Sequence, residues 1–314
     1  MNARRHWPEF WAALQAQTLH PEEVIVVDSA STDGTAELAR ASGARVVHIE
    51  RNNFRHGAAR QLAAELAGDI EILLYMTQDC VLAQRDSIYR LLSRFDDRHI
   101  AAAYGRQLPR EGADPIEAHA RLFNYPDKST IRSLDDALVA GFKTIFFSNA
   151  FGAYRRSALM RVGGFPIEAQ FGEDTQVVAK MLLVQNKIAY AADAKALHSH
   201  AFSMTQEFHR YFEIGRMHAS EPWLEQRFGG TRGEGLRFVR SELSYLAHRA
   251  PHLVPAALIR TATKYLAYKH GKRSEAFSEK RKERVARDAI NLRSSSLDAN
   301  LARHLNNLVQ KFHD

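Results

Sequence analysis

Short apolar runs alternate with helical patterns along the first two-thirds of the chain. Strand-like runs lie at residues 24–27, 44–50, 72–75 and 101–109, at the start of 144–166, and in 188–200 as a strand pair or one extended segment. Helical patterns lie at residues 7–14, at 35–41, after the polar loop 51–60 as far as 67, at 86–95 and from about 173. Strands that alternate with short helices imply βαβ units. The pattern therefore predicts an α/β fold with a mostly parallel sheet flanked by helices.

The run from Ile72 to Tyr75 shows no amphipathic alternation, which is typical of a central strand buried on both faces. Asp79 follows this run, and open α/β sheets bind ligands outside the carboxyl ends of their strands. Asp79 is therefore a candidate carboxylate for handling metal or phosphate. The alternative is that Asp79 only caps the helix predicted at residues 86–95.

Beyond Phe202 the pattern becomes helical, at residues 205–228, 236–249 and 255–270, with a glycine-containing linker at 229–235. We therefore expect two regions, residues 1–228 and residues 229–314. The net charge of +7 comes from the second region, because residues 232–314 hold 17 Lys/Arg against 8 Asp/Glu.

Basic amphipathic helices that carry aromatic residues suit an anionic membrane surface. The alternative is a pair of helices packed on the first region with solvated Lys and Arg side chains at their rims. A nucleic-acid partner is disfavoured, because no recognised binding motif accompanies the charge.

The cysteine content and the lack of long apolar runs limit the cellular compartment in which the protein is expected. Cys80 is the single cysteine, which excludes an internal disulfide and fits a reducing compartment. No signal peptide opens the chain and no apolar run approaches the roughly 20 residues of a membrane span. The expected location is therefore cytoplasmic.

Five motifs follow one another in order: VIVVDSASTDGT (24–35), FRHGAARQLA (54–63), YMTQDC (75–80), SNAFGAYRRSALMRVGGFP (148–166) and FGEDTQVVAKMLL (171–183). In this order and spacing, over residues 7–215, the chain resembles family 2 glycosyltransferases. The pairing of H-G-x-x-R with T-Q-D resembles the rhamnosyltransferases of bacterial surface polysaccharides. The resemblance implies a Rossmann-like GT-A catalytic domain at residues 1–228 and a basic helical extension at residues 229–314.

The resemblance also implies roles for individual residues. The residues implied to contact the donor nucleotide are Asp28 with Ser29, Asp33, the loop residues His56, Gly57 and Arg60, and Gln78, which is next to the acid implied to bind metal. Asp79 matches the last acid of the D-x-D motif, which holds Mg²⁺ or Mn²⁺ against the diphosphate. Asp174, with Glu173 beside it, matches the general base, and His198 or His200 matches a histidine that completes the metal site in some members.

Simpler interpretations stand beside these roles. Glu173 and Asp174 also fit a plain helix start, and the two histidines also fit contact with acceptor or phosphate, or packing.

The residue types agree with the chemistry of an inverting transfer. A hard divalent cation neutralises a diphosphate leaving group, and inversion needs one base. A helix N-terminus favours the charged form of Asp174. Gln78 replaces another acid of D-x-D, so we expect weak metal binding, or metal binding only together with the nucleotide.

Asn2 and Ala3 match the end of the motif that follows the first strand of the family. Either the start site is wrong, or the catalytic domain lacks that strand, in which case we expect poor activity or stability. The expected function is metal-dependent, inverting transfer of L-rhamnose from dTDP-L-rhamnose to a glycan or lipid-linked acceptor. The rivals are transfer of another nucleotide sugar and a catalytically impaired nucleotide-sugar-binding protein. A Rossmann dehydrogenase is disfavoured, because no G-x-G-x-x-G follows a predicted strand.

Overall fold

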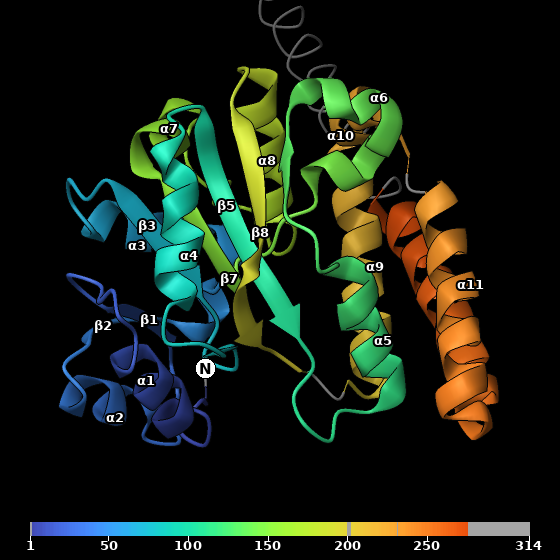
Figure 1. The fold of residues 1–314 in the computed structure, drawn as a ribbon, viewed down its shortest axis with the longest axis horizontal. Helices are drawn as coiled ribbons and strands as arrows, with labels where there is room; N and C mark the ends of the chain where they lie inside the picture. The colour runs from blue at the N-terminus through green and yellow to red at the C-terminus, as the bar shows by residue number, and fades with distance from the viewer. Residues whose placement is uncertain (1, 200–201, 231, 276–314) are drawn as a thin grey trace, which may run out of the picture.

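The computed structural model describes residues 2–199, 202–230 and 232–275. A central sheet is flanked by helices, with a small second sheet on one side and a group of C-terminal helices on the other (Figure 1). The strands are β1 Ile25–Ser29, β2 Arg45–Ile49, β3 Ile72–Met76, β4 Val81–Leu82, β5 Ile100–Leu108, β6 Thr130–Arg132, β7 Phe151–Arg155 and β8 Lys187–Leu197.

Helices cover both faces of the central sheet. The α-helices are α1 Trp7–Gln15, α2 Thr35–Ala41, α3 His56–Leu66, α4 Ser87–Leu92, α5 Pro115–Asn124, α6 Ala137–Ala140, α7 Arg156–Arg161, α8 Glu173–Leu183, α9 Met204–Ser220, α10 Pro222–Phe228 and α11 Arg232–Arg249. Short 3₁₀ segments are η1 Arg51–Asn53, η2 Ser93–Asp96, η3 Leu134–Asp136, η4 Gly141–Ile145 and η5 Pro251–Leu253. A last helix is described over residues 254–275. The α/β class and the helical C-terminal part are confirmed.

The central sheet is mixed, which corrects the expectation of a mostly parallel sheet. Its strand order is β3-β7-β5-β8-β4, with β6 also paired to β8. Only β5 and β8 pair in parallel within it, because β7 runs antiparallel between β3 and β5, and β4 and β6 run antiparallel to β8. The second sheet consists of β1 and β2, which pair in parallel.

Strand β3 is an edge strand of the described sheet rather than a central one. It pairs with β7 alone, and of its five residues only Leu73 is fully buried. Strand β1 likewise pairs on one side only, with β2. Within the described residues each of these strands therefore has one edge without a strand partner. That a first strand is missing, and that activity or stability is poor, remain predictions.

The prediction of a strand at the start of residues 144–166 is wrong. Residues up to Ile145 belong to the 3₁₀ segment η4, and the strand is β7, which begins at Phe151. The guanidinium of Arg132 donates to the carbonyls of Lys143 (2.7 Å) and Phe146 (2.9 Å). These carbonyls are therefore occupied by a side chain instead of a neighbouring strand.

The core lies on both faces of the central sheet, as the alternation along its strands requires. On one face, Tyr154 and Tyr190 pack with the apolar side of α8. On the other face, Phe151 packs with α1 and α4, through Trp7 and Leu91 among others. Because α8 packs against the sheet through its buried side, its first residues are held in a fixed position beside the sheet.

The C-terminal helices pack closely on α9 and α5 (Figure 1). A Cβ atom on Gly215 would lie 2.2 Å from the carbonyl oxygen of Tyr268, and one on Gly271 would lie 2.0 Å from that of Phe212. The expected linker at residues 229–235 is shorter than predicted, because α11 already begins at Arg232. The division between residues 228 and 229 stays a prediction. Among the described helices, none is both long enough and apolar enough to cross a membrane.

Candidate active site

Asp28 lies at the carboxyl end of β1, where its carboxylate is buried. The backbone N–H of Ser31 donates to it at 3.0 Å and the Ser31 hydroxyl donates as well, while His48 Nδ1 lies 3.4 Å away. Burial works to raise the pKa of Asp28, but the hydrogen bonds from Ser31 outweigh it, so that the pKa lies below its usual value. Ser29 beside it is buried too. The loop thus holds an ionised acid at the carboxyl end of a strand, and a contact of Asp28 with a nucleotide remains a prediction.

Asp33 has a structural task at the start of α2. Its carboxylate accepts from the hydroxyl and the backbone N–H of Thr35, the latter at 3.0 Å, and from the backbone N–H of Arg4 at 3.0 Å. These bonds hold the loop, the helix start and the N-terminal residues together. A contact of Asp33 with a nucleotide remains a prediction.

The N-terminal turn of α3 brings three of the predicted residues together. Gly57 is required by close packing, because a Cβ atom there would lie 1.8 Å from the carbonyl oxygen of Pro166. Burial, with help from the charge of Arg60, lowers the pKa of His56. Arg60 Nη1 lies 2.6 Å from Glu173 Oε1, so α3 is joined to the start of α8 by an ion pair. The loop at the start of α3 and the first residue of α8, more than a hundred positions apart in the sequence, are therefore in contact.

Glu173 and Asp174 open α8 with different surroundings. Glu173 is buried and, besides Arg60, accepts from Asn149 Nδ2 at 3.1 Å. Asp174 accepts from the backbone N–H of Thr175 at 2.7 Å and of Asn149 at 3.4 Å. Glu173 thus positions the helix start, whereas Asp174 is held mainly by backbone groups.

The backbone N–H of Thr175 at the helix start favours the charged form of Asp174, as expected, but other effects outweigh it. Burial, followed by the like charge of Glu173, raises the pKa of Asp174 to about 7. The opposing effects of Arg60 and of the two backbone N–H groups are smaller. A carboxylate with this pKa is well matched to accepting a proton near neutral pH.

Asp79 and His198 meet beside the carboxyl end of β3. His198 Nε2 lies 3.3 Å from Asp79 Oδ1, and His198 Nδ1 lies 2.7 Å from Gln107 Oε1. Burial lowers the pKa of His198, against the raising effect of Asp79. In the neutral ring the proton on Nδ1 is donated to Gln107, which leaves the Nε2 lone pair directed toward Asp79. An imidazole nitrogen and a carboxylate that converge in this way fit a divalent cation.

The described residues supply only part of a metal-ligand set. No group of three or more His, Cys, Asp or Glu side chains among them is arranged to hold a metal ion. His200, the other predicted ligand, lies outside the described residues. Gln78 is partly exposed beside Asp79 and adds no carboxylate. The expectation of weak metal binding, or of binding together with the nucleotide, is in keeping with this small set.

Several residues of the site had no predicted role. Asn149 contacts both acids at the start of α8 and accepts from the hydroxyl of Tyr154 at 2.7 Å. Its neighbour Ala150 accepts from the backbone N–H of Thr77 at 3.3 Å, so the segment before β7 connects the Asp79 loop with α8. The fully buried Gln107, which orients His198, is a polar residue in an apolar strand, a signal visible in the sequence.

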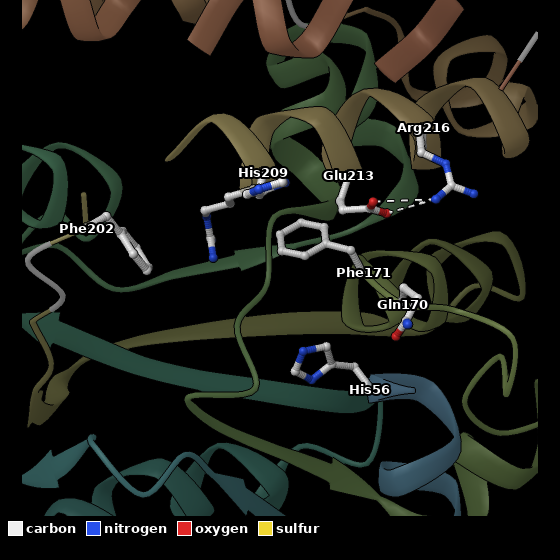
Figure 2. A pocket seen from close by; sticks show the side chains of 8 residues that line it. His56, Gln170, Phe171, Phe202, His209, Glu213 and Arg216 are labelled. Carbon is white, nitrogen blue, oxygen red and sulfur yellow. Dashed lines mark hydrogen bonds and ion pairs between the residues drawn. The ribbon is translucent and has the colours of Figure 1, made fainter. Parts of the chain in front are cut away.

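A pocket of about 420 Å³ opens between α9 and the starts of α3 and α8. Figure 2 shows His56, Phe171 and His209 directed into this space, and Glu213 paired with Arg216 at its margin. His56, the first residue of α3, lines this pocket, so the pocket adjoins the site described above.

Comparison with known proteins identifies the family of the chain. A sequence profile described as "Glycosyl transferase family 2" matches residues 4–163. The chain is 43% identical over 272 residues to the O-antigen chain rhamnosyltransferase RfbN of Salmonella typhimurium strain LT2, covering 86% of this chain and 87% of that one. It is 42% identical over 266 residues to the O-antigen chain rhamnosyltransferase WbaN of Salmonella anatum, covering 85% and 84%.

Solved structures share the fold at lower identity. A mannosyltransferase from Pyrobaculum calidifontis, in complex with GDP-Man and Mn²⁺, has a TM-score of 0.53 at 18% identity over 87% of this chain and 81% of that one. Residues 1–349 of TarS from S. aureus give 0.50 at 18% identity over 88% and 89%. With the family profile spanning half of the sequence and two relatives above 40% identity, the chain belongs to glycosyltransferase family 2.

Proposed function

We propose that this protein transfers L-rhamnose, with inversion, from dTDP-L-rhamnose to a glycan or lipid-linked acceptor in the synthesis of a bacterial surface polysaccharide. The single observation that carries the transfer chemistry is Asp174, a carboxylate with a raised pKa at the start of α8, braced by the Arg60–Glu173 ion pair. The choice of sugar is supported by the identity to two O-antigen rhamnosyltransferases.

Asp174 would act as the general base. It would take the proton of the acceptor hydroxyl while that oxygen attacks the anomeric carbon, and the nucleoside diphosphate would leave from the opposite face. Arg60 and Asn149 hold Glu173 in place, so that the neighbouring carboxylate keeps its orientation. Orientation of this kind lowers the barrier without new covalent chemistry.

Asp79 and His198 would hold Mg²⁺ or Mn²⁺ together with the diphosphate of the donor. When bound, the ion supplies positive charge that neutralises the leaving diphosphate. Gln107 contributes by holding the His198 ring in the orientation that directs Nε2 toward Asp79. His200 remains a candidate additional ligand.

A lipid-linked acceptor would bring the protein to the inner face of the cytoplasmic membrane. One side of the helix over residues 254–275 supports such a contact, because Leu258, Ile259, Tyr265 and Leu266 on it are between 49% and 63% exposed. Lys269, His270 and Arg273 are exposed on the next turns of the same helix. An apolar stripe with adjacent basic residues is complementary to an anionic lipid surface.

Transfer assays with the full chain distinguish an active transferase from a catalytically impaired nucleotide-sugar-binding protein. Purified protein would be given dTDP-L-rhamnose, UDP-glucose or GDP-mannose, with lipid-linked acceptor and with Mn²⁺, Mg²⁺ or EDTA. We expect metal-stimulated transfer from dTDP-L-rhamnose alone. Asp174→Asn should abolish transfer and retain donor binding, whereas the exposed control Asp69→Asn should keep both. Undiminished transfer by Asp174→Asn would overturn the mechanism, and preference for another donor would overturn the sugar assignment.

A further inference from the structure

Arg210 of α9 lines the pocket beside the active site and is held there by two aromatic rings. Its guanidinium carbon lies 5.0 Å from the ring centre of Phe171 and 5.7 Å from that of Phe202. Phe171 directly precedes Gly172 and the start of α8, and Phe202 directly precedes the Ser203 cap of α9. Stacking on two rings from different segments orients a long, flexible side chain before any ligand binds.

The charge of Arg210 has no carboxylate partner among the residues that the structure describes, in contrast to the other arginines near it. Arg216, in the same pocket, pairs with Glu213 at 3.4 Å and with Glu275 at 2.8 Å. Arg60 pairs with Glu173. Arg210 is also exposed to the pocket, so a ligand reaches its guanidinium without breaking an ion pair.

Arg210 lines the same pocket as His56, the first residue of α3. Its positive charge contributes to the lowered pKa of His56, for which burial is the main cause. His56 begins the loop proposed to contact the nucleotide, so a cation beside it lies near the place where the diphosphate of the donor would bind.

The donor's negative charge needs a partner that Asp79 and His198 do not provide by themselves. With Gln78 in place of an acid, the protein offers few ligands to a metal ion, so less of the phosphate charge is balanced through the metal. The flat guanidinium of arginine binds phosphate oxygens through two parallel N–H donors. Its charge also stabilises the leaving diphosphate as the glycosidic bond breaks.

We infer that Arg210 is a binding residue for the diphosphate group of the nucleotide sugar, presented to it by Phe171 and Phe202. The inference rests on the proposed function, because it takes the ligand to be a nucleoside diphosphate donor. It adds a cation from α9, outside residues 4–163 that match the family profile.

Calorimetric titration of the full chain with dTDP and with dTMP tests the assignment. Arg210→Gln should weaken dTDP binding by about tenfold or more, in line with loss of a charged hydrogen bond, and dTMP binding by much less. The ratio of the two affinities should therefore fall. Arg216→Gln, which removes a guanidinium already paired with two carboxylates in the same pocket, is the matched control and should leave the ratio unchanged. Arg210→Lys should restore part of the ratio of dTDP affinity to dTMP affinity.

Each other outcome has a defined meaning. An equal loss for dTDP and dTMP would make Arg210 structural, and unchanged dTDP affinity with a raised KM for the acceptor would place it in the acceptor site; both overturn the inference. If the unaltered protein prefers UDP or GDP, the rhamnose donor is wrong, and the same ratio measured for that nucleotide and its monophosphate decides on Arg210. If it binds no nucleoside diphosphate, both proposals fail.

Discussion

At the start of α8, two neighbouring carboxylates are given different properties by their surroundings. Glu173 is buried in an ion pair with Arg60, and Asp174 is left with backbone donors and the like charge of Glu173. Burial and that like charge raise the pKa of Asp174 to about 7. A separation of roles between adjacent acids is typical of sites that move a proton.

The rate of transfer should therefore depend on pH through Asp174. Only its ionised form accepts a proton, so we expect kcat/KM to rise as the pH increases through about 7. Glu173→Gln should move the midpoint to lower pH, because it removes a like charge that raises the pKa of Asp174. Initial rates between about pH 5.5 and 9 measure both midpoints. A midpoint that Glu173→Gln leaves in place would show that another group controls the rate.

The same raised pKa should reduce stability at neutral pH. In the folded protein Asp174 holds its proton up to about pH 7, whereas the unfolded chain releases it near the ordinary value of 3.8. Stability therefore falls as the pH rises through this window, by at most about 4 kcal/mol and by about 1–2 kcal/mol after solvent screening at a partly exposed group. Asp174→Asn should be more stable than the unaltered protein at pH 8, with no difference near pH 4. Urea unfolding at the two pH values measures this, and an equal or lower stability at pH 8 would contradict it.

Among the elements, β7 and the segment before it connect separate parts of the site. It runs antiparallel between β3 and β5, and the segment before it reaches both the Asp79 loop and the start of α8. Asn149 occupies that segment, so its side chain and backbone serve both acids of α8. The segment before the inserted antiparallel strand is what joins the Asp79 loop to the start of α8.

The contact between α9 and the helix over residues 254–275 should depend on its two glycines. Gly215→Ala or Gly271→Ala places a methyl group where a backbone carbonyl already lies, so the helices must separate. We expect a loss of about 1–3 kcal/mol in the free energy of unfolding, and faster proteolysis of the C-terminal helix. Gly233→Ala, in the first turn of α11 with nothing within 4 Å of its Cβ position, is the matched control. Equal stability of all three variants would contradict the close packing.

At the scale of the whole molecule, the C-terminal helices present one face to the catalytic part and another to the outside. On the inner face, Lys264 lies 3.3 Å from Glu207, and Lys272 lies 2.9 Å from Glu225. The outer face carries the exposed apolar stripe with Lys269 and Arg273. Basic residues of this region thus divide into packing residues and surface residues. Packing on the first region is confirmed for Lys264 and Lys272, and membrane contact through the outer face remains a prediction.

Binding to anionic vesicles should depend on the outer face alone. The double variant Lys269→Glu/Arg273→Glu should reduce the affinity for phosphatidylglycerol-containing vesicles, measured by co-sedimentation, by about thirtyfold or more, because each of the two basic residues near such a surface contributes about 1 kcal/mol. The control Arg98→Glu/Lys128→Glu makes the same change in net charge at exposed positions elsewhere and should bind normally. Binding by the unaltered protein should weaken with added salt. Equal binding by both double variants would exclude this face as the membrane contact.

The sequence by itself determined the features that depend on nearby residues. Thr35–Ala41 was predicted as a helix and is one, and the helix start at Glu173 and the strand at Ile72 were predicted to within a residue. Local propensity, capping and apolar periodicity act over a few residues, so they can be read without the fold. The motifs likewise located Asp28, Arg60, Asp79 and Asp174.

Only the tertiary structure decided what those residues do to one another. The pairing of Arg60 with Glu173 spans more than a hundred residues of sequence, and the raised pKa of Asp174 follows from burial and from that cluster of charges. The antiparallel insertion of β7 and the aromatic support of Arg210 also arise from segments distant in sequence. Ion pairing and desolvation depend on distance in space, and a sequence pattern specifies distance only along the chain.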